Sequence, residues 1–205
     1  RGASSVLGLV DTHDAFVGLV SRAQKKDVQV ALGTALARSP ALAVPALAEV
    51  ARRLSGPAIV RFSGALWKHT EDVQDVLGCA IRFRGDRPRT PELAPADQDL
   101  LFATFRSLWS LLPATLRTRQ HDYLHNDYYT VGVYEAPGLG WVELRLVPAQ
   151  SVASTGGSRD ERLAQAMRSG AAELRLELRH SRRGAPWQPL CEVRLVGPLA
   201  FDEAL

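Results

Sequence analysis

Residues 171–180 alternate between two kinds of side chain, and this alternation limits what the chain can fold into. Leu174, Leu176 and Leu178 take every second position, and charged residues from Glu173 to Arg179 take the positions between them. Successive side chains of a β-strand point to opposite faces of its sheet. The pattern therefore predicts a strand that places its leucines in a core and its charges on the outer face.

Apolar or alternating runs recur along the chain and predict about eight strands in total. Between two of these runs, residues 137–140 read Pro-Gly-Leu-Gly, which favours a hairpin turn. Short strands linked mostly by hairpins favour an antiparallel barrel or a sandwich. The predicted strands are 6–12, 58–63, 78–83, 99–104, 128–136, 141–148, 171–180 and 190–199.

Helical patterns occupy the segment of about 15–54, which we expect to form a helical insert between strands. Phe16, Leu19, Val28 and Leu32 fall near helical spacing and predict a helix over 15–39 that ends at Pro40. A second Ala/Leu-rich helix is predicted over 41–54, with a kink at Pro45. We expect the insert to cover the core, and the alternatives are a surface for a partner protein, for an oligomer or for lipid. Further helices are predicted at 105–116, broken by Pro113, and at 159–168.

Composition indicates one globular domain spanning residues 1–205. The net charge is +3, but basic and acidic residues are well mixed, and no Lys/Arg block is long enough to indicate nucleic-acid binding. No apolar run reaches the roughly 18 residues of a membrane span. Cys79 and Cys191 lie inside apolar strand-like runs, which favours two core residues over a disulfide or a metal pair. This usage fits a reducing, cytoplasmic compartment.

Two of the predicted strands carry Arg-Phe at or next to their ends. Val60–Ser63 reads Val-Arg-Phe-Ser, and Gly78–Phe83 reads Gly-Cys-Ala-Ile-Arg-Phe. The pair resembles the catalase superfamily, in which one barrel strand ends in Val-Arg-Phe-Ser and the next reads Gly-x-Ala-x-Arg/Lys-Phe. Asp99–Leu101 and Leu144–Pro148 resemble two further strands of that family. The resemblance implies an α+β fold, an eight-stranded antiparallel β-barrel of catalase-like type with flanking helices.

The resemblance also implies a haem site and a function. Arg61 matches the arginine that pairs with a haem propionate, Ser63 the serine that orients the distal histidine, and Gly78 the glycine that lets the porphyrin approach. Arg1 begins a segment that resembles the one following the distal histidine, so it is a further cofactor-binding candidate. The implied protein handles peroxide or organic hydroperoxide with haem. We expect Arg61 and Ser63 to point into the barrel or the pocket at its mouth, with Arg61 paired to an anion or a carboxylate.

Two haem-contacting groups of that family have no match in this sequence. The distal histidine would precede Arg1, and the proximal tyrosine, in an Arg-x-x-x-Tyr motif, would follow Leu205. Arg119–Tyr123 spells this motif but precedes the predicted strand 128–136. Either the missing segments lie outside the sequence, or haem has another ligand, or the barrel is a haem-free module for an apolar ligand or a partner protein. For this polypeptide we expect little haem and no rapid oxygen release from peroxide.

The densest polar cluster of the sequence lies at residues 121–127. His121 and His125 are four residues apart and could hold a divalent metal if the segment were helical. With Tyr123 they are also the candidates for an unforeseen haem ligand. The alternative is a solvated loop that leads into the strand predicted at 128–136.

Overall fold

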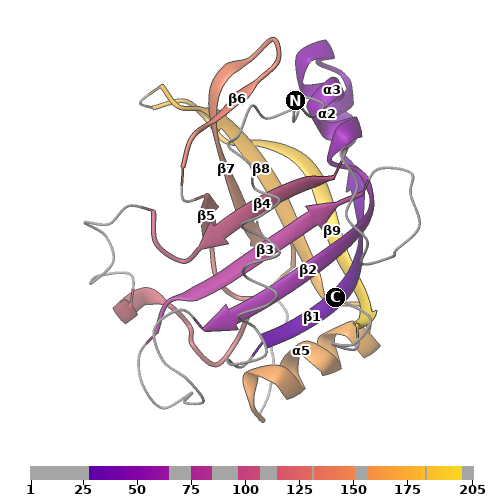
Figure 1. The fold of residues 1–205 in the computed structure, drawn as a ribbon, viewed down its shortest axis with the longest axis vertical. Coiled ribbons are helices and arrows are strands. Elements are labelled where there is room, and N and C mark those ends of the chain that lie inside the picture. The colour runs from indigo at the N-terminus through magenta and orange to yellow at the C-terminus, as the bar shows by residue number, and fades with distance from the viewer. Residues whose placement is uncertain are drawn as a thin grey trace.

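Nine β-strands form a single antiparallel sheet in the computed structural model, which describes residues 28–64, 75–84, 97–106, 115–130, 132–150, 157–182 and 184–199 (Figure 1). The strands are β1 Val28–Ala37, β2 Gly56–Gly64, β3 Leu77–Phe83, β4 Gln98–Ala103, β5 Tyr128–Thr130, β6 Tyr134–Ala136, β7 Gly140–Pro148, β8 Glu173–His180 and β9 Gln188–Pro198.

The sheet closes into a barrel. Neighbouring strands follow the order β5-β4-β3-β2-β1-β9-β8-β7, and the additional pairing of β5 with β7 joins the two ends of this row. The eight-stranded antiparallel barrel is thereby confirmed, and the sandwich alternative is not what forms. The predicted strands in the second half of the chain are also confirmed to within two residues at β7, β8 and β9.

The strand predicted at 128–136 is divided in two. β5 ends at Thr130 and lies in the ring between β4 and β7, whereas β6 begins at Tyr134 and pairs with β7 outside the ring. The hairpin turn between β6 and β7 is confirmed, and Gly138 and Gly140 adopt φ angles of +74° and +71° there. These left-handed values suit glycine, since other residues are strained at positive φ.

The helix predicted over 15–39 is wrong where the structure describes it, because residues 28–37 form strand β1. The helical insert of 15–54 is therefore a strand followed by helices in its described part. Ala31 and Ala35 are buried in the core, with Gly33 between them, and the strand pairs with both β2 and β9. Alanine-rich sequence favours helix locally, but small side chains also fill a narrow barrel interior, and pairing on both sides decides the outcome.

Three helices close the two ends of the barrel (Figure 1). α2 (Ser39–Leu42) and α3 (Pro45–Arg53) replace the predicted helix 41–54 and meet at the kink expected at Pro45. Each has a proline in its first turn, where the missing N–H costs no hydrogen bond. α5 (Arg159–Arg168) matches its prediction and begins with a capping box between Ser158 and Glu161. No helix in the described ranges is long and apolar enough to cross a membrane.

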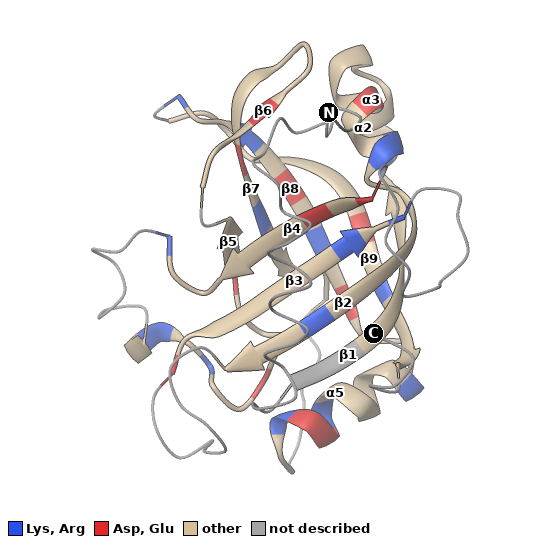
Figure 2. Cartoon of the chain, viewed as in Figure 1, with Lys and Arg blue, Asp and Glu red and all other residues tan. Residues whose placement is uncertain are grey.

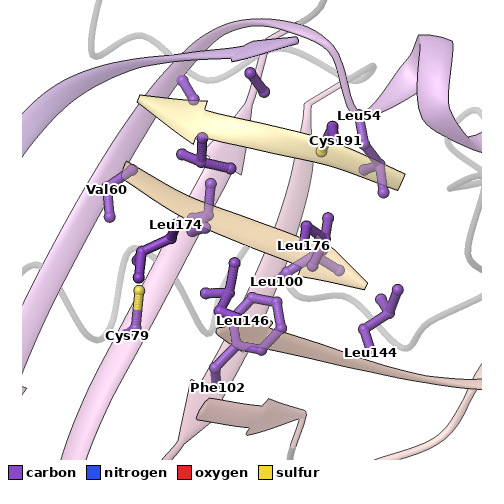
Figure 3. Packing of buried hydrophobic residues seen from close by; sticks show 14 of the residues in the cluster. Leu54, Val60, Cys79, Leu100, Phe102, Leu144, Leu146, Leu174, Leu176 and Cys191 are labelled. Carbon is purple, nitrogen blue, oxygen red and sulfur yellow. The ribbon is translucent and has the colours of Figure 1, made fainter. Parts of the chain in front are cut away.

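Inward-facing side chains fill the barrel (Figure 3). Leu174, Leu176 and Leu178 are at most 1% exposed, as the alternation of their strand predicts. Val60 and Phe102 meet them from the opposite wall, and helices α3 and α5 add apolar residues at the two ends. The interior is therefore a packed core in the described residues, with side chains from every wall.

Several predicted elements fall partly or wholly outside the described residues. The strand 6–12 and Arg1 lie outside them, as do residues 107–114 of the helix predicted at 105–116. The ends of that helix are described: residues 105–106 are not helical, and 115–117 form a single helical turn. The strands predicted at 58–63, 78–83 and 99–104 are confirmed as β2, β3 and β4.

Both cysteines are free and buried in the core, which confirms the prediction made for them. Burial raises the pKa of the Cys191 thiol to about 12 and also raises the pKa of Cys79. Because the thiolate is the reactive form, we expect neither thiol to react with Ellman's reagent at pH 8 in the native protein. Both should react in 6 M guanidinium chloride. Rapid modification of the folded protein would contradict this placement.

Candidate functional site

The outer face of β2 and β3 brings together three residues that the sequence singles out. Val60 and Phe62 of β2 belong to the barrel core, so the alternating Arg61 and Ser63 lie on the opposite, outer face. Ser63 is the direct cross-strand partner of Gly78 on β3. The expectation that Arg61 and Ser63 point into the barrel is therefore wrong.

The burial of β2 does not indicate which of its faces points inward. Every residue of β2 from Ala58 to Gly64 is buried, so both faces of the strand are covered. A strand buried on both faces carries no alternation of polar and apolar residues that would tell its two faces apart. The inward face becomes evident from the structure, in which Val60 and Phe62 belong to the same core cluster as the leucines of β8 (Figure 3).

Arg61 is a buried cation with unused hydrogen-bonding capacity. The residue is 4% exposed, and within the described part of the chain no acceptor reaches its Nε. Burial lowers the pKa of its guanidinium, since desolvation disfavours the charged form. A buried charge is costly unless an anion or hydrogen-bond acceptor meets it. The site is therefore suited to an anionic group placed against Arg61.

Gly78 makes room for Ser63. A Cβ atom at position 78 would lie 3.1 Å from Ser63 Oγ, which is closer than most real Cβ contacts. The φ angle of Gly78 is not among the positive ones, so space and not backbone conformation favours glycine here. The pair gives this part of the outer face a hydroxyl beside bare backbone, next to the arginine two residues away on β2.

Two buried ion pairs flank this face, and sequence reasoning missed both. Arg82 donates from Nε and Nη2 to the two carboxylate oxygens of Asp99 at 2.8 and 2.7 Å. The Arg82 side chain is 3% exposed and that of Asp99 is 2% exposed. Arg84 Nε lies 3.7 Å from Asp97 Oδ1, again with both side chains buried. Figure 2 shows the basic position near the end of β3 beside the acidic position of β4.

A sequence signal for these pairs does exist. Arg82 and Arg84 are two residues apart at the end of β3, and Asp97 and Asp99 are two residues apart at the start of β4. Alternation places each pair on one face of its strand. An antiparallel hairpin then sets Arg82 opposite Asp99, as the register shows. The two spacings considered together would have predicted these two ion pairs.

The polar cluster at 121–127 is a hydrogen-bonded loop. Its residues form turns and not a helix, so the helical geometry needed for the predicted metal site is absent. His125 Nδ1 lies 2.8 Å from Asp122 Oδ2, and the Leu124 amide donates to Asp122 Oδ1. Asn126 accepts from the Arg119 amide and donates to the Arg119 carbonyl oxygen. Across the described ranges, no group of three or more His, Cys, Asp or Glu residues is placed to hold a metal ion.

Tyr123, the tyrosine of the Arg-x-x-x-Tyr pattern, lies inside the barrel. Its ring stacks on Phe62 with the ring centroids 5.0 Å apart, and the residue is 1% exposed. Arg159 of α5 also contacts this ring, and its guanidinium carbon lies 5.3 Å from the Tyr123 ring centroid. The wall formed by β2 therefore separates Tyr123 from the face that carries Arg61.

The chain was compared with known proteins at the level of sequence. A scan against protein-family models found no match, and a search of curated proteins found no significantly similar sequence.

Proposed function

We propose that the chain is a catalase-like barrel that binds haem against the outer face of β2 and β3, in a protein that handles peroxide or organic hydroperoxide. The observation that supports this proposal is the buried Arg61, whose Nε has no acceptor in the described part of the chain. Ser63 and Gly78 lie beside it on the same face, in the strand order of the motif that the sequence resembles.

The residues of this face fit one end of the cofactor. Arg61 would meet a propionate, because a guanidinium offers N–H donors in a plane that suits a carboxylate. Its neighbour Arg82 is already paired with Asp99, whereas Arg61 Nε has no acceptor in the described part of the chain. Ser63 would place its hydroxyl toward a polar group on the reactive side. Haem, when bound, would supply the iron chemistry with peroxide.

A haem-free barrel that binds a ligand or a partner protein is the second candidate. It is favoured by the position of Tyr123, which stacks on Phe62 in the core on the other side of β2 from Arg61. In this case Arg61 and Ser63 serve an anionic group other than a propionate. The same experiment separates the two candidates.

The haem proposal predicts that the purified protein binds protoporphyrin IX through its carboxylates. Fluorescence titration should show saturable binding of protoporphyrin IX and clearly weaker binding of its dimethyl ester. Arg61→Gln should weaken binding of the free acid by about 10- to 100-fold, because hydrogen bonds to charged groups contribute about 1.5–3 kcal/mol. The ester should be affected little by this substitution.

Arg53→Gln is the matched control for this titration. Arg53 lies on α3 with a 51% exposed side chain, so its loss changes the net charge equally without touching the outer face of β2. Circular dichroism should establish that both variants are folded. If the wild type binds acid and ester equally, or if Arg53→Gln has the same effect as Arg61→Gln, the haem proposal fails and the haem-free barrel remains.

A further inference from the structure

A cleft on the outside of the barrel collects three arginines. It has a volume of about 550 Å³ and lies where the loop before β5 approaches the ends of β7 and β8. Small-molecule sites typically measure roughly 300–1,000 Å³, so the cleft has the size of such a site. The residues lining it that carry polar groups are Arg119, Arg145, Arg175, His125, Gln150 and Asp127.

One buried carboxylate holds two of these arginines in place. Glu177 is 6% exposed and accepts from Arg145 Nε at 2.8 Å through one oxygen. Its other oxygen accepts from Arg175 Nε, also at 2.8 Å. Each guanidinium has five N–H donors, so both retain donors after these contacts. Glu177 thus fixes two guanidinium groups beside each other without using up their capacity to bind an anion.

The ring of Trp187 supports the same arrangement from the side. The guanidinium carbon of Arg145 lies 4.5 Å from the ring centroid, and that of Arg179 lies 4.4 Å from it. Contacts of this kind between a cation and an aromatic face are favourable. Arg145 is therefore held by an ion pair and by an aromatic ring, which lowers the entropy that a ligand would have to remove on binding.

The third arginine comes from the loop described above. The backbone N–H and C=O of Arg119 are both bonded to the Asn126 side chain, at 2.8 and 3.0 Å. Its side chain is exposed and lines the cleft. The loop thus presents a charged side chain from a fixed backbone position to the same cleft as the pair that Glu177 contacts on the sheet.

We propose that this cleft binds a small multivalent oxyanion, a metabolite that carries phosphate or several carboxylate groups. Three guanidinium groups line it against the single carboxylate of Asp127, and planar N–H donors recognise such oxygens in pairs. The site lies on β7, β8 and the loop before β5, whereas Arg61 lies on β2. It therefore does not depend on haem binding.

Calorimetric titration at constant ionic strength tests the proposal with two probes, pyrophosphate and citrate. We expect saturable binding of at least one, and the preferred probe distinguishes a phosphate ligand from a carboxylate ligand. Arg119→Gln and Arg175→Gln should each weaken that binding by about 10- to 100-fold, the range expected for losing a hydrogen bond to a charged group. Arg145 is left intact in this test, because it contacts both Glu177 and the Trp187 ring.

Arg182→Gln is the matched control, since Arg182 is exposed in the turn between β8 and β9 and does not line the cleft. Its binding should equal that of the wild type. Two results would overturn the proposal: no saturable binding of either probe, or equal weakening of the binding by Arg182→Gln. Porphyrin binding should be unchanged in Arg119→Gln, so the two sites can fail separately.

Discussion

Arg82→Ala should lower the free energy of unfolding by about 3–5 kcal/mol, the usual cost of removing one partner of a buried ion pair. The reason is that Asp99 remains in the variant without its ionic partner. Its carboxylate is 2% exposed in the native pair and would stay buried without its bidentate donor. Urea denaturation followed by far-ultraviolet circular dichroism measures the loss directly.

Two further variants make this result specific. Replacing both partners, Arg82→Met with Asp99→Leu, should recover most of the loss, because apolar side chains of similar size need no ionic partner. Arg38→Ala should cost no more than about 1 kcal/mol, since its ion pair with Glu192 is partly exposed to water. A double variant as unstable as Arg82→Ala would mean that the arginine acts through packing and not through charge.

Phe62→Ala should lower the free energy of unfolding by about 3–5 kcal/mol, as is typical when a large core aromatic residue is truncated. Phe62 is fully buried, and its ring centroid lies 5.0 Å from that of Tyr123 and 6.2 Å from that of Tyr128. The cavity would form between β2 and the loop of residues 119–126. Denaturant titration gives the size of the loss.

Hydrogen exchange locates the same effect. In Phe62→Ala, the amide of Leu124, which donates to Asp122, should exchange faster relative to the amides of β8. Phe62→Leu is the control, because it retains an apolar side chain at the site and should cost less on both measures. Equal loosening of the loop and of β8 would show that the substitution acts on the whole barrel and not on this contact.

The sequence predicts the second half of the barrel well and the first strand poorly. β8 alternates between buried leucines and charged residues, so its pattern carries both the type of element and its inward face. β1 contains Ala31, Gly33 and Ala35 where a typical strand would have large apolar residues. Local propensity favours a helix for such a composition, and only its pairing with β2 and β9 makes it a strand.

The sequence predicts that Arg61, Ser63 and Gly78 lie close together, but it does not predict which face of the barrel wall they occupy. Arg61, Ser63 and Gly78 do lie together, because adjacent strands in register bring a motif at the end of one beside the start of the next. Which face they occupy depends on what covers each side of β2, and the sequence of a strand buried on both faces does not encode that. The arginine cleft is harder still to predict from the sequence, since Arg119 lines it from a loop whose backbone is bonded to the Asn126 side chain.

Closure of the ring depends on its shortest member. β5 has three residues and is joined to β7 through two register pairs, Tyr128 with Leu146 and Tyr129 with Arg145. A closed sheet leaves no row of free backbone donors and acceptors that could recruit another chain. Displacing β5 from the ring would expose one side of β4 and part of one side of β7 at once. The resistance of the protein to edge-to-edge aggregation thus depends on β5, which is held on each side by two register pairs, fewer than at any other junction in the ring.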